Sequence, residues 1–339
     1  MRKKKSNITI KVVADRAGVS TATVSRVITG SDVVSPRRRK RVDRAIKELG
    51  YSPNRAAREL RIGAVLKIGV VLSDIQNPFF TGCLAGIESV LQSSDYVLIL
   101  GNSKEDPRIE KMHLNSLISD GVGGIILALT SGYDDCYQDL AKSDIPMVAI
   151  DRESKYLLVD SVVIDNVSAS FQATECLAKL GHRRIGYIGG PLHISTSQER
   201  LKGYKEALTN LDIPIEDDLI VNGQYRQGGG CAAMEELLNL PERPTALLIA
   251  NNLMTLGALE AIYQHDIQIP EALALVAFDD TPWNIALKTP LTVIAQPTYQ
   301  LGEFAAKLLL DRIKNPDQPL QKIMLKGELI IRDSCGSKI

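Results

Sequence analysis

Polar and aromatic side chains follow short apolar segments of the chain, directly or on the next helical segment. Nine such residues are Asn77, Phe79, Phe80, Asp151, Arg152, Arg200, Asn251, Asp279 and Gln296. Carboxylates and amides accept hydrogen bonds from hydroxyl groups, guanidinium groups donate them, and aromatic rings pack against the C–H face of a sugar. If these side chains converge, they favour a binding site for a polyhydroxyl ligand.

Each of these residues also fits an ordinary structural role. An aspartate after a strand is commonly a loop cap, and Phe79 or Phe80 alone could belong to a core. A purine or nucleoside is a second ligand that aromatic faces with Asn, Asp and Arg groups could bind. The convergence of all nine is what favours a site over separate structural roles.

The sequence contains few patterns typical of catalytic or metal-binding sites. The four histidines have no metal-ligand spacing, and the Gly189-Gly190-Pro191 turn is not a GxGxxG motif. Asp279 and Asp280 are neighbours, and neighbouring side chains on extended backbone point in opposite directions. The five cysteines are scattered without CxxC spacing, which favours reduced thiols over disulfides. We expect no enzymatic activity, no metal and no cofactor.

Strands and helices alternate from Lys67 onward, and they must position the nine residues. Strands are predicted at 67–73, 97–100, 124–129, 146–150, 184–189, 246–250 and 273–278, with helices such as 81–92 and 108–120 between them. This alternation is typical of parallel, doubly wound sheets, and its restart near residue 184 predicts two similar lobes. Ligands of such sheets bind beyond the carboxyl ends of the strands, here between the lobes.

The chain should cross between the two lobes three times. The crossings are expected near residues 164–165, near residues 291–296 and close to the C-terminus.

The N-terminal segment differs sharply in charge from the rest. Residues 1–61 carry 17 Lys and Arg against 5 Asp and Glu, whereas the remainder carries 23 basic and 35 acidic residues. Helices are predicted at 10–17, 21–28 and 36–49, with Gly18 in the first turn, Ser20 as a cap of the second helix, and Pro36 at the first position of the third. A basic helix-turn-helix unit that binds DNA is the expected structure.

The motifs AGVS, TVSRV, VSPRRRKRV and ELGYSPNRAAR stand in register over about fifty residues, and this segment resembles the head of the LacI/GalR family of regulators. One departure is Val12, where the family usually has Asp. The resemblance implies that Thr21, Ala22 and Arg26 face the major groove. Arg26 is suited to guanine and Ala22 to a thymine methyl group, whereas Thr23 and Ser25 suit phosphate contacts.

The segment after Pro53 matches the hinge of the same family. It is too short to be a stable helix by itself, and an ordinary flexible linker is the alternative. The resemblance implies a hinge helix that binds the minor groove beside its dimer mate, with a leucine wedged between base steps. The residues assigned to these contacts are Asn54, Arg55, Ala57 and Leu60.

The body resembles periplasmic sugar receptors of the D-ribose-binding type. NPFF, ERLKGY, ANNLMTLGA, AFDDTPW and VIAQP carry the resemblance, and all nine residues named above match sugar-contacting positions. Tyr225 falls where such receptors have another aromatic residue. Trp283 is an addition after AFDDTP, and Thr130-Ser131 replaces an Asn-bearing loop. Tyr225 and Trp283 complete the expected effector-binding set.

The predicted fold class is α/β, with a helix-turn-helix head and a two-lobed, periplasmic-binding-protein-like body containing two doubly wound parallel sheets. The predicted domains are a head at 1–52, a hinge at 53–63 and a body at 64–339, with lobe 1 at 64–164 and 296–325 and lobe 2 at 165–295 and 326–339.

The predicted function is that of a homodimeric transcriptional repressor that binds a near-palindromic operator under allosteric control by a monosaccharide. A sugar receptor without a DNA role is opposed by the basic head. No apolar run approaches the roughly 20 residues of a membrane helix, and no signal segment follows the basic N-terminus, so a cytoplasmic protein without membrane contact is expected.

Overall fold

The chain divides into two compact units, Met1–Val65 and Leu66–Ile339, here called the head and the body. The computed structural model describes residues 10–28, 34–49, 67–94, 96–130, 137, 140, 143–154 and 156–336. The predicted hinge contacts lie outside the described residues and stay predictions, as do the predicted domain limits at residues 52 and 63. No helix in the described ranges is long and apolar enough to cross a membrane.

The described part of the head consists of three helices. They are α1 (Ile10–Ala17), α2 (Thr21–Ile28) and α3 (Pro36–Leu49). The predicted limits of all three are confirmed. Val13, Val24 and Val42 are fully buried between the helices and fix their packing.

The turn between α1 and α2 has the expected chemistry. Gly18 takes a φ of +60°, which a residue without a side chain adopts at little cost. The hydroxyl of Ser20 then accepts a hydrogen bond from the N–H of Thr23 at 3.2 Å, which caps the start of α2. This turn sets α2 against α1.

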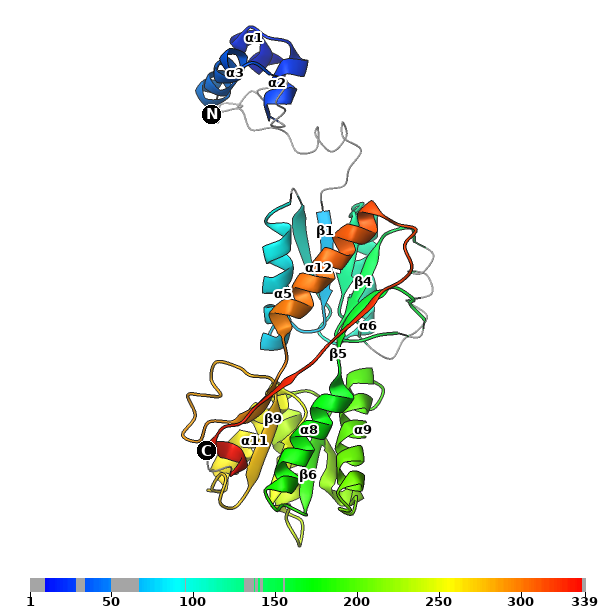
Figure 1. Ribbon diagram of the computed structural model, residues 1–339, viewed down its shortest axis with the longest axis vertical. Coiled ribbons are helices and arrows are strands. Elements are labelled where there is room, and N and C mark those ends of the chain that lie inside the picture. The colour runs from blue at the N-terminus through cyan, green and yellow to red at the C-terminus, as the bar shows by residue number, and fades with distance from the viewer. Residues whose placement is uncertain are drawn as a thin grey trace, which may run out of the picture. The chain divides into compact units, whose positions relative to one another are not determined.

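A six-stranded sheet forms each lobe of the body (Figure 1). In the first lobe the spatial order is β11 (Lys322–Leu325), β5 (Asp160–Ile164), β4 (Met147–Ile150), β3 (Gly124–Leu127), β1 (Lys67–Leu72), β2 (Val97–Asn102). In the second it is β12 (Glu328–Ile330), β10 (Thr292–Ala295), β9 (Ala274–Phe278), β8 (Ala246–Ile249), β6 (Ile185–Gly189), β7 (Ile220–Asn222).

Helices pack against the two sheets. The first lobe contains α5 (Pro78–Leu91), α6 (Pro107–Ser119) and α12 (Thr298–Lys314). The second contains α8 (Asn166–Lys179), α9 (Ser195–Asn210), α10 (Gln227–Leu238) and α11 (Asn252–Gln264), with short 3-10 turns at Asp217–Leu219 and Asp333–Cys335. Mostly aliphatic cores lie against the sheets.

The two lobes have the same strand order, which confirms the prediction of two similar doubly wound sheets. One pairing departs from it, because β12 runs antiparallel to β10, whereas the other recorded strand pairs are parallel. β12 is the last piece of chain to enter the second lobe, and it comes from the opposite direction. In each sheet the strand order reverses between the first strand and the third, which is where ligands of such folds bind.

Glycines allow the helices α5 and α12 to approach at backbone distance. A Cβ atom on Gly302 would overlap the carbonyl oxygen of Cys83, and one on Gly86 would overlap that of Tyr299. The close pairing of these helices therefore depends on two residues that have no side chain.

Three segments of chain connect the lobes. They follow β5 at Asp165, β10 at Gln296, and β11 at Lys326, near the predicted positions. The N–H of Asp165 donates to the carbonyl of Leu325 at 2.9 Å, which joins the first and third segments. A Cβ atom on Gly327 would lie 2.8 Å from the Ile294 side chain, so the third segment also packs against β10, the strand that precedes the second segment.

Candidate functional site

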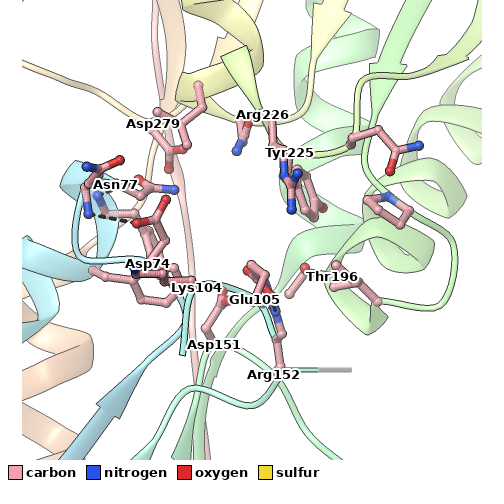
Figure 2. A pocket seen from close by; sticks show the side chains of 18 of the residues that line it. Asp74, Asn77, Lys104, Glu105, Asp151, Arg152, Thr196, Tyr225, Arg226 and Asp279 are labelled. Atoms are coloured by element: carbon pink, nitrogen blue, oxygen red, sulfur yellow. Dashed lines mark hydrogen bonds and ion pairs between the residues drawn. The ribbon is translucent and has the colours of Figure 1, made fainter. Parts of the chain in front are cut away.

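A cavity of about 860 Å³ lies between the lobes of the body (Figure 2). It is bordered by the ends of β1, β2 and β4 in the first lobe and by the starts of α9, α10 and α11 in the second. Ten of the eleven predicted effector residues line it: Asn77, Phe79, Phe80, Asp151, Arg152, Arg200, Tyr225, Asn251, Asp279 and Gln296. Their contacts with a ligand stay predictions, but the fold does bring them together.

Trp283 is the predicted residue that does not line the cavity. Its side chain packs against the aliphatic core of the second lobe and is partly buried there. The segment after Asp280 turns back toward this core, since Asn284 donates to the carbonyl of Asp279 at 2.9 Å. The position of Trp283 after a cavity strand was therefore a poor guide to its surroundings.

Arg152 is held by a carboxylate that the sequence did not single out. Its two terminal nitrogens donate to the two carboxylate oxygens of Glu105, each at 2.8 Å, and one also donates to the carbonyl of Leu129 at 3.0 Å. Its Nε lies 3.3 Å from Asp151. The guanidinium group is therefore largely occupied by the protein, which leaves the Asp151 carboxylate without a hydrogen-bond donor from the described residues.

Arg200 organises the second-lobe side of the cavity. It donates to Asn166 at 2.8 Å and to the carbonyl of Ala250 at 2.5 Å, and it lies 4.3 Å from the centre of the Phe278 ring. A longer contact of 3.4 Å reaches the amide oxygen of Gln296. Like Arg152, it is mostly committed to the protein, so its main effect on a ligand is electrostatic.

Asp279 connects elements that approach the cavity from different directions. One carboxylate oxygen accepts from the side-chain amide of Gln296 at 2.6 Å, and the other accepts from the backbone N–H of Asn252 at 3.1 Å. The first contact involves the segment that crosses between the lobes, and the second involves the start of α11. Asp279 can still accept further hydrogen bonds from a ligand, because each oxygen has a second lone pair.

A direct hydrogen bond connects the lobes at the edge of the cavity. The side-chain amide of Asn252 donates to the side-chain oxygen of Asn77 at 2.8 Å, and the exposed fractions of these residues are 2% and 9%. The same oxygen of Asn77 accepts from the N–H of Phe79 and caps α5. One buried amide therefore supports both the helix start and the contact between lobes.

Phe79 and Phe80 form the aromatic part of the first-lobe wall. Their rings pack edge to face with centres 5.0 Å apart, and both are nearly buried. They line the cavity while also belonging to the core of the first lobe. The structural and binding roles considered for them are compatible.

Backbone strain is concentrated around this cavity. Eight described residues other than glycine have positive φ, and six of these line the cavity: Lys104, Glu105, Asp151, Gln224, Tyr225 and Asp279. Left-handed backbone costs free energy in residues with side chains and tends to occur at functional sites. Its position here supports a binding role for the cavity.

Matching turns place Glu105 and Tyr225 in the two walls. β2 and β7 each end in an asparagine, and its side chain accepts the N–H of the residue two positions later, Lys104 at 3.3 Å and Gln224 at 2.9 Å. The next residue then points toward the cavity in each lobe. Comparing the two Asn-x-x-x turns could have identified Glu105, which sequence reasoning missed.

Burial changes the acidity of the cavity carboxylates. Desolvation raises the pKa of Asp151 although Arg152 and Arg200 oppose this, and it raises the pKa of Asp279 although Arg200 and Gln296 oppose it. The two carboxylates of the cavity accept hydrogen bonds strongly while both are ionised.

Among the described residues, no group of three or more His, Cys, Asp and Glu side chains could hold a metal ion.

The recognition surface predicted on α2 is partly visible. Thr21, Ala22 and Arg26 are exposed, whereas Thr23 and Ser25 are half-buried. The hydroxyl of Thr23 shares a 3.0 Å hydrogen bond with that of Ser20 at the helix start. Exposure agrees with the contacts assigned to the first three, and all five assignments stay predictions.

Sequence comparisons match both units. The profile of bacterial regulatory proteins of the lacI family matches residues 9–54, and that of the periplasmic binding protein-like domain matches residues 174–335. The ribose operon repressor of Haemophilus influenzae is 35% identical over 97% of this chain and 99% of its own length. The transcriptional repressor CytR of Escherichia coli is 34% identical over 98% of each chain.

Solved structures give the same result for the fold. A lac repressor dimer bound to operator and the anti-inducer ONPF aligns with a TM-score of 0.86 and 27% identity, covering 97% of this chain and 99% of that one. A complex of the regulator CelR with cellobiose aligns with a TM-score of 0.74 and 34% identity, covering 96% and 99%. The predicted resemblance is confirmed over the head and the body.

Proposed function

The chain belongs to the lacI family of bacterial regulatory proteins, and on that premise we propose that a sugar bound between the lobes controls its affinity for operator DNA. It is a DNA-binding transcriptional regulator and not an enzyme. The observation that supports a sugar is the cavity itself, which places carboxylates and amides beside the rings of Phe79 and Phe80. One similar protein is a ribose operon repressor, and one similar solved structure is a regulator in complex with cellobiose.

Control of operator binding follows from the position of the cavity. Asp151 lies in the first lobe and Asp279 in the second, so a ligand that contacts both favours the arrangement in which both are within reach. If DNA prefers one arrangement, the two affinities are coupled reciprocally, typically by about 1–3 kcal/mol.

We also propose that the protein binds a near-palindromic operator as a homodimer. The lac repressor structure it resembles is a dimer on operator DNA. A single α2 offers few base contacts, and two-fold symmetry doubles them. Sedimentation of the full chain with operators containing one or two half-sites tests this, and equal affinity for both operators would contradict it.

A ligand panel tests the effector class. Melting of the full chain is followed with pentoses, hexoses, disaccharides, nucleosides and free purines, because a ligand that binds the native state raises the midpoint. Calorimetric titration then measures the affinity of each compound that shifts it. Stabilisation by a sugar, together with a change in operator affinity, is the expected result. Binding of a nucleobase without any sugar response would overturn it.

Asp279→Asn should abolish most of the sugar response. Asparagine tolerates the positive φ of this residue and retains one oxygen, so it keeps one of the two hydrogen bonds that Asp279 accepts from the protein while the charge is lost. Loss of a charge-assisted hydrogen bond should weaken sugar binding by about 1.5–3 kcal/mol. Operator affinity of the free protein should not change. Asp280→Asn is the matched control, because Asp280 pairs with Arg332 and does not line the cavity.

Sugar affinity should fall as the pH decreases, and it should do so above the usual range of an aspartate. Asp151 and Asp279 have raised pKa values, so each takes up a proton at a higher pH than it would in the unfolded chain and then accepts hydrogen bonds less well. Titration of the sugar identified by the panel at several pH values measures this. Asp151→Asn should bind more weakly with a flatter profile, and a profile as steep as that of the unchanged protein would exclude Asp151.

A further inference from the structure

The second-lobe wall of the cavity contains two helix starts without side-chain caps. α9 begins after Ile194 and α10 after Arg226, and neither of these residues caps its helix with a side chain. α5 and α11 also begin at the cavity, but Asn77 and Asn251 cap them. The first N–H groups of an uncapped helix need an acceptor and carry partial positive charge.

Thr196, in the first turn of α9, provides an independent indication of a ligand. Its exposed fraction is only 3%, it lines the cavity, and its hydroxyl has no hydrogen-bond partner among the described residues. The hydroxyl is not among the fully buried polar atoms without a partner, so this otherwise buried side chain presents its one polar atom to the cavity. Its position at the cavity wall indicates that the partner is supplied by a ligand.

The charge of this wall is positive. Arg226 lines the cavity, and its guanidinium group is not paired with any carboxylate of the described residues. The segments that line the cavity here, 191–196 and 224–227, contain no acidic residue. The cavity carboxylates Asp74, Glu105, Asp151 and Asp279 come from other segments, and Glu105 is neutralised by Arg152.

The two helix starts form one surface. The ring of Tyr225 lies so close to Gly190 that a Cβ atom on that glycine would overlap it, which brings the loop before α9 against the turn before α10. Figure 2 shows Tyr225 and Arg226 together at the top of the view, Asp151 and Arg152 at the bottom, and Thr196 at the right between the two pairs. A cavity of about 860 Å³ is near the upper end of the usual range, which leaves space beside one sugar ring.

We propose that the effector is a sugar carrying a phosphate ester, and that this group binds at the starts of α9 and α10 against Thr196 and Arg226. Backbone N–H groups, a hydroxyl and a guanidinium group together match the several oxygens of a phosphate. The proposal rests on the proposed sugar-binding function and specifies its ligand. A sugar acid would present a carboxylate to the same groups and is a separate outcome of the test.

Inorganic phosphate is the first probe, used with the full chain. Melting is measured in phosphate and in chloride at equal ionic strength, for the unchanged protein and for Arg226→Gln, Thr196→Val and Lys202→Gln. The basic head is also expected to bind phosphate, so the decisive quantity is the difference between variants. Lys202 is an exposed cation of α9 that does not line the cavity, and its variant should respond like the unchanged protein. Arg226→Gln and Thr196→Val should lose part of the shift.

Sugars then separate this proposal from the proposed function. D-ribose, D-glucose, their terminal phosphates and D-gluconate are titrated by calorimetry. At least one phosphate should bind about tenfold more tightly than its parent sugar, and Arg226→Gln should remove that difference without changing the affinity of the parent. Gluconate binding in place of the phosphates would overturn the phosphate assignment.

The proposed phosphate site would be overturned if phosphate raised the melting temperature of all four proteins equally. It would also be overturned if Arg226→Gln lowered the affinities for the phosphate ester and the parent sugar equally. Sugar binding without preference for the ester would contradict this inference alone. Absence of binding by any sugar or ester would contradict the proposed function itself.

Discussion

Arg26→Ala should lower operator affinity by about 1–3 kcal/mol and relax the preference for one base pair in each half-site. Arg26 is exposed in the last turn of α2, the helix assigned to the major groove. An arginine that donates two hydrogen bonds to guanine distinguishes it from the other bases. Operator affinities are measured on a set in which each half-site position is substituted in turn, at one fixed salt concentration.

Lys47→Ala is the control for Arg26, because it removes the same charge from an exposed position on α3. Its effect on affinity should be similar for all operators in the set, as expected for a charge that acts only through the phosphate backbone. If Arg26→Ala also weakens every operator equally, then Arg26 does not read a base.

Gly302→Ala should destabilise the first lobe by about 3 kcal/mol or more, since the added methyl group overlaps the backbone of α5. Backbone atoms of a packed helix cannot move aside as the end of a flexible side chain can. The two helices must separate, and apolar contacts along their whole interface weaken. Chemical unfolding of the full chain, followed by circular dichroism, measures the change.

Gly228→Ala is the matched control for helix propensity. Gly228 lies in the first turn of α10, and a Cβ atom there would meet nothing within 4 Å. Alanine should be neutral or stabilising at this position, because it favours a helix by up to about 1 kcal/mol. Equal stability of Gly302→Ala and the unchanged protein would show that α12 can move away from α5 at no cost.

Most of the body fold could be predicted because its central strands are buried on both faces. β1, β3 and β8 are continuous apolar runs that stand out in the sequence. β7, β11 and β12 could not be predicted in this way. They have only three or four residues, and those are exposed or half-buried, so neither length nor hydrophobic pattern marks them.

In the candidate site, residues marked by the local sequence could be predicted, whereas contacts between residues far apart in the sequence could not. Asp151, Asp279 and Asn251 could be placed because each directly follows a predicted strand. The partners of the arginines could not, because Glu105 is 47 residues from Arg152 and Asn166 is 34 residues from Arg200. Such pairs depend on how the lobe folds around the side chain, and no local pattern encodes them.

The three connections between the lobes have a mechanical consequence. The first and third connections are joined by the hydrogen bond from Asp165 to Leu325, and the third packs on Ile294 of β10, so we expect the connections to move together. A flat layer of joined segments bends more easily across its plane than within it. The main relative movement of the lobes should therefore be a hinge motion that changes a single opening angle. A small ligand then needs to shift only the opening angle between the lobes. Binding therefore costs little entropy of lobe orientation.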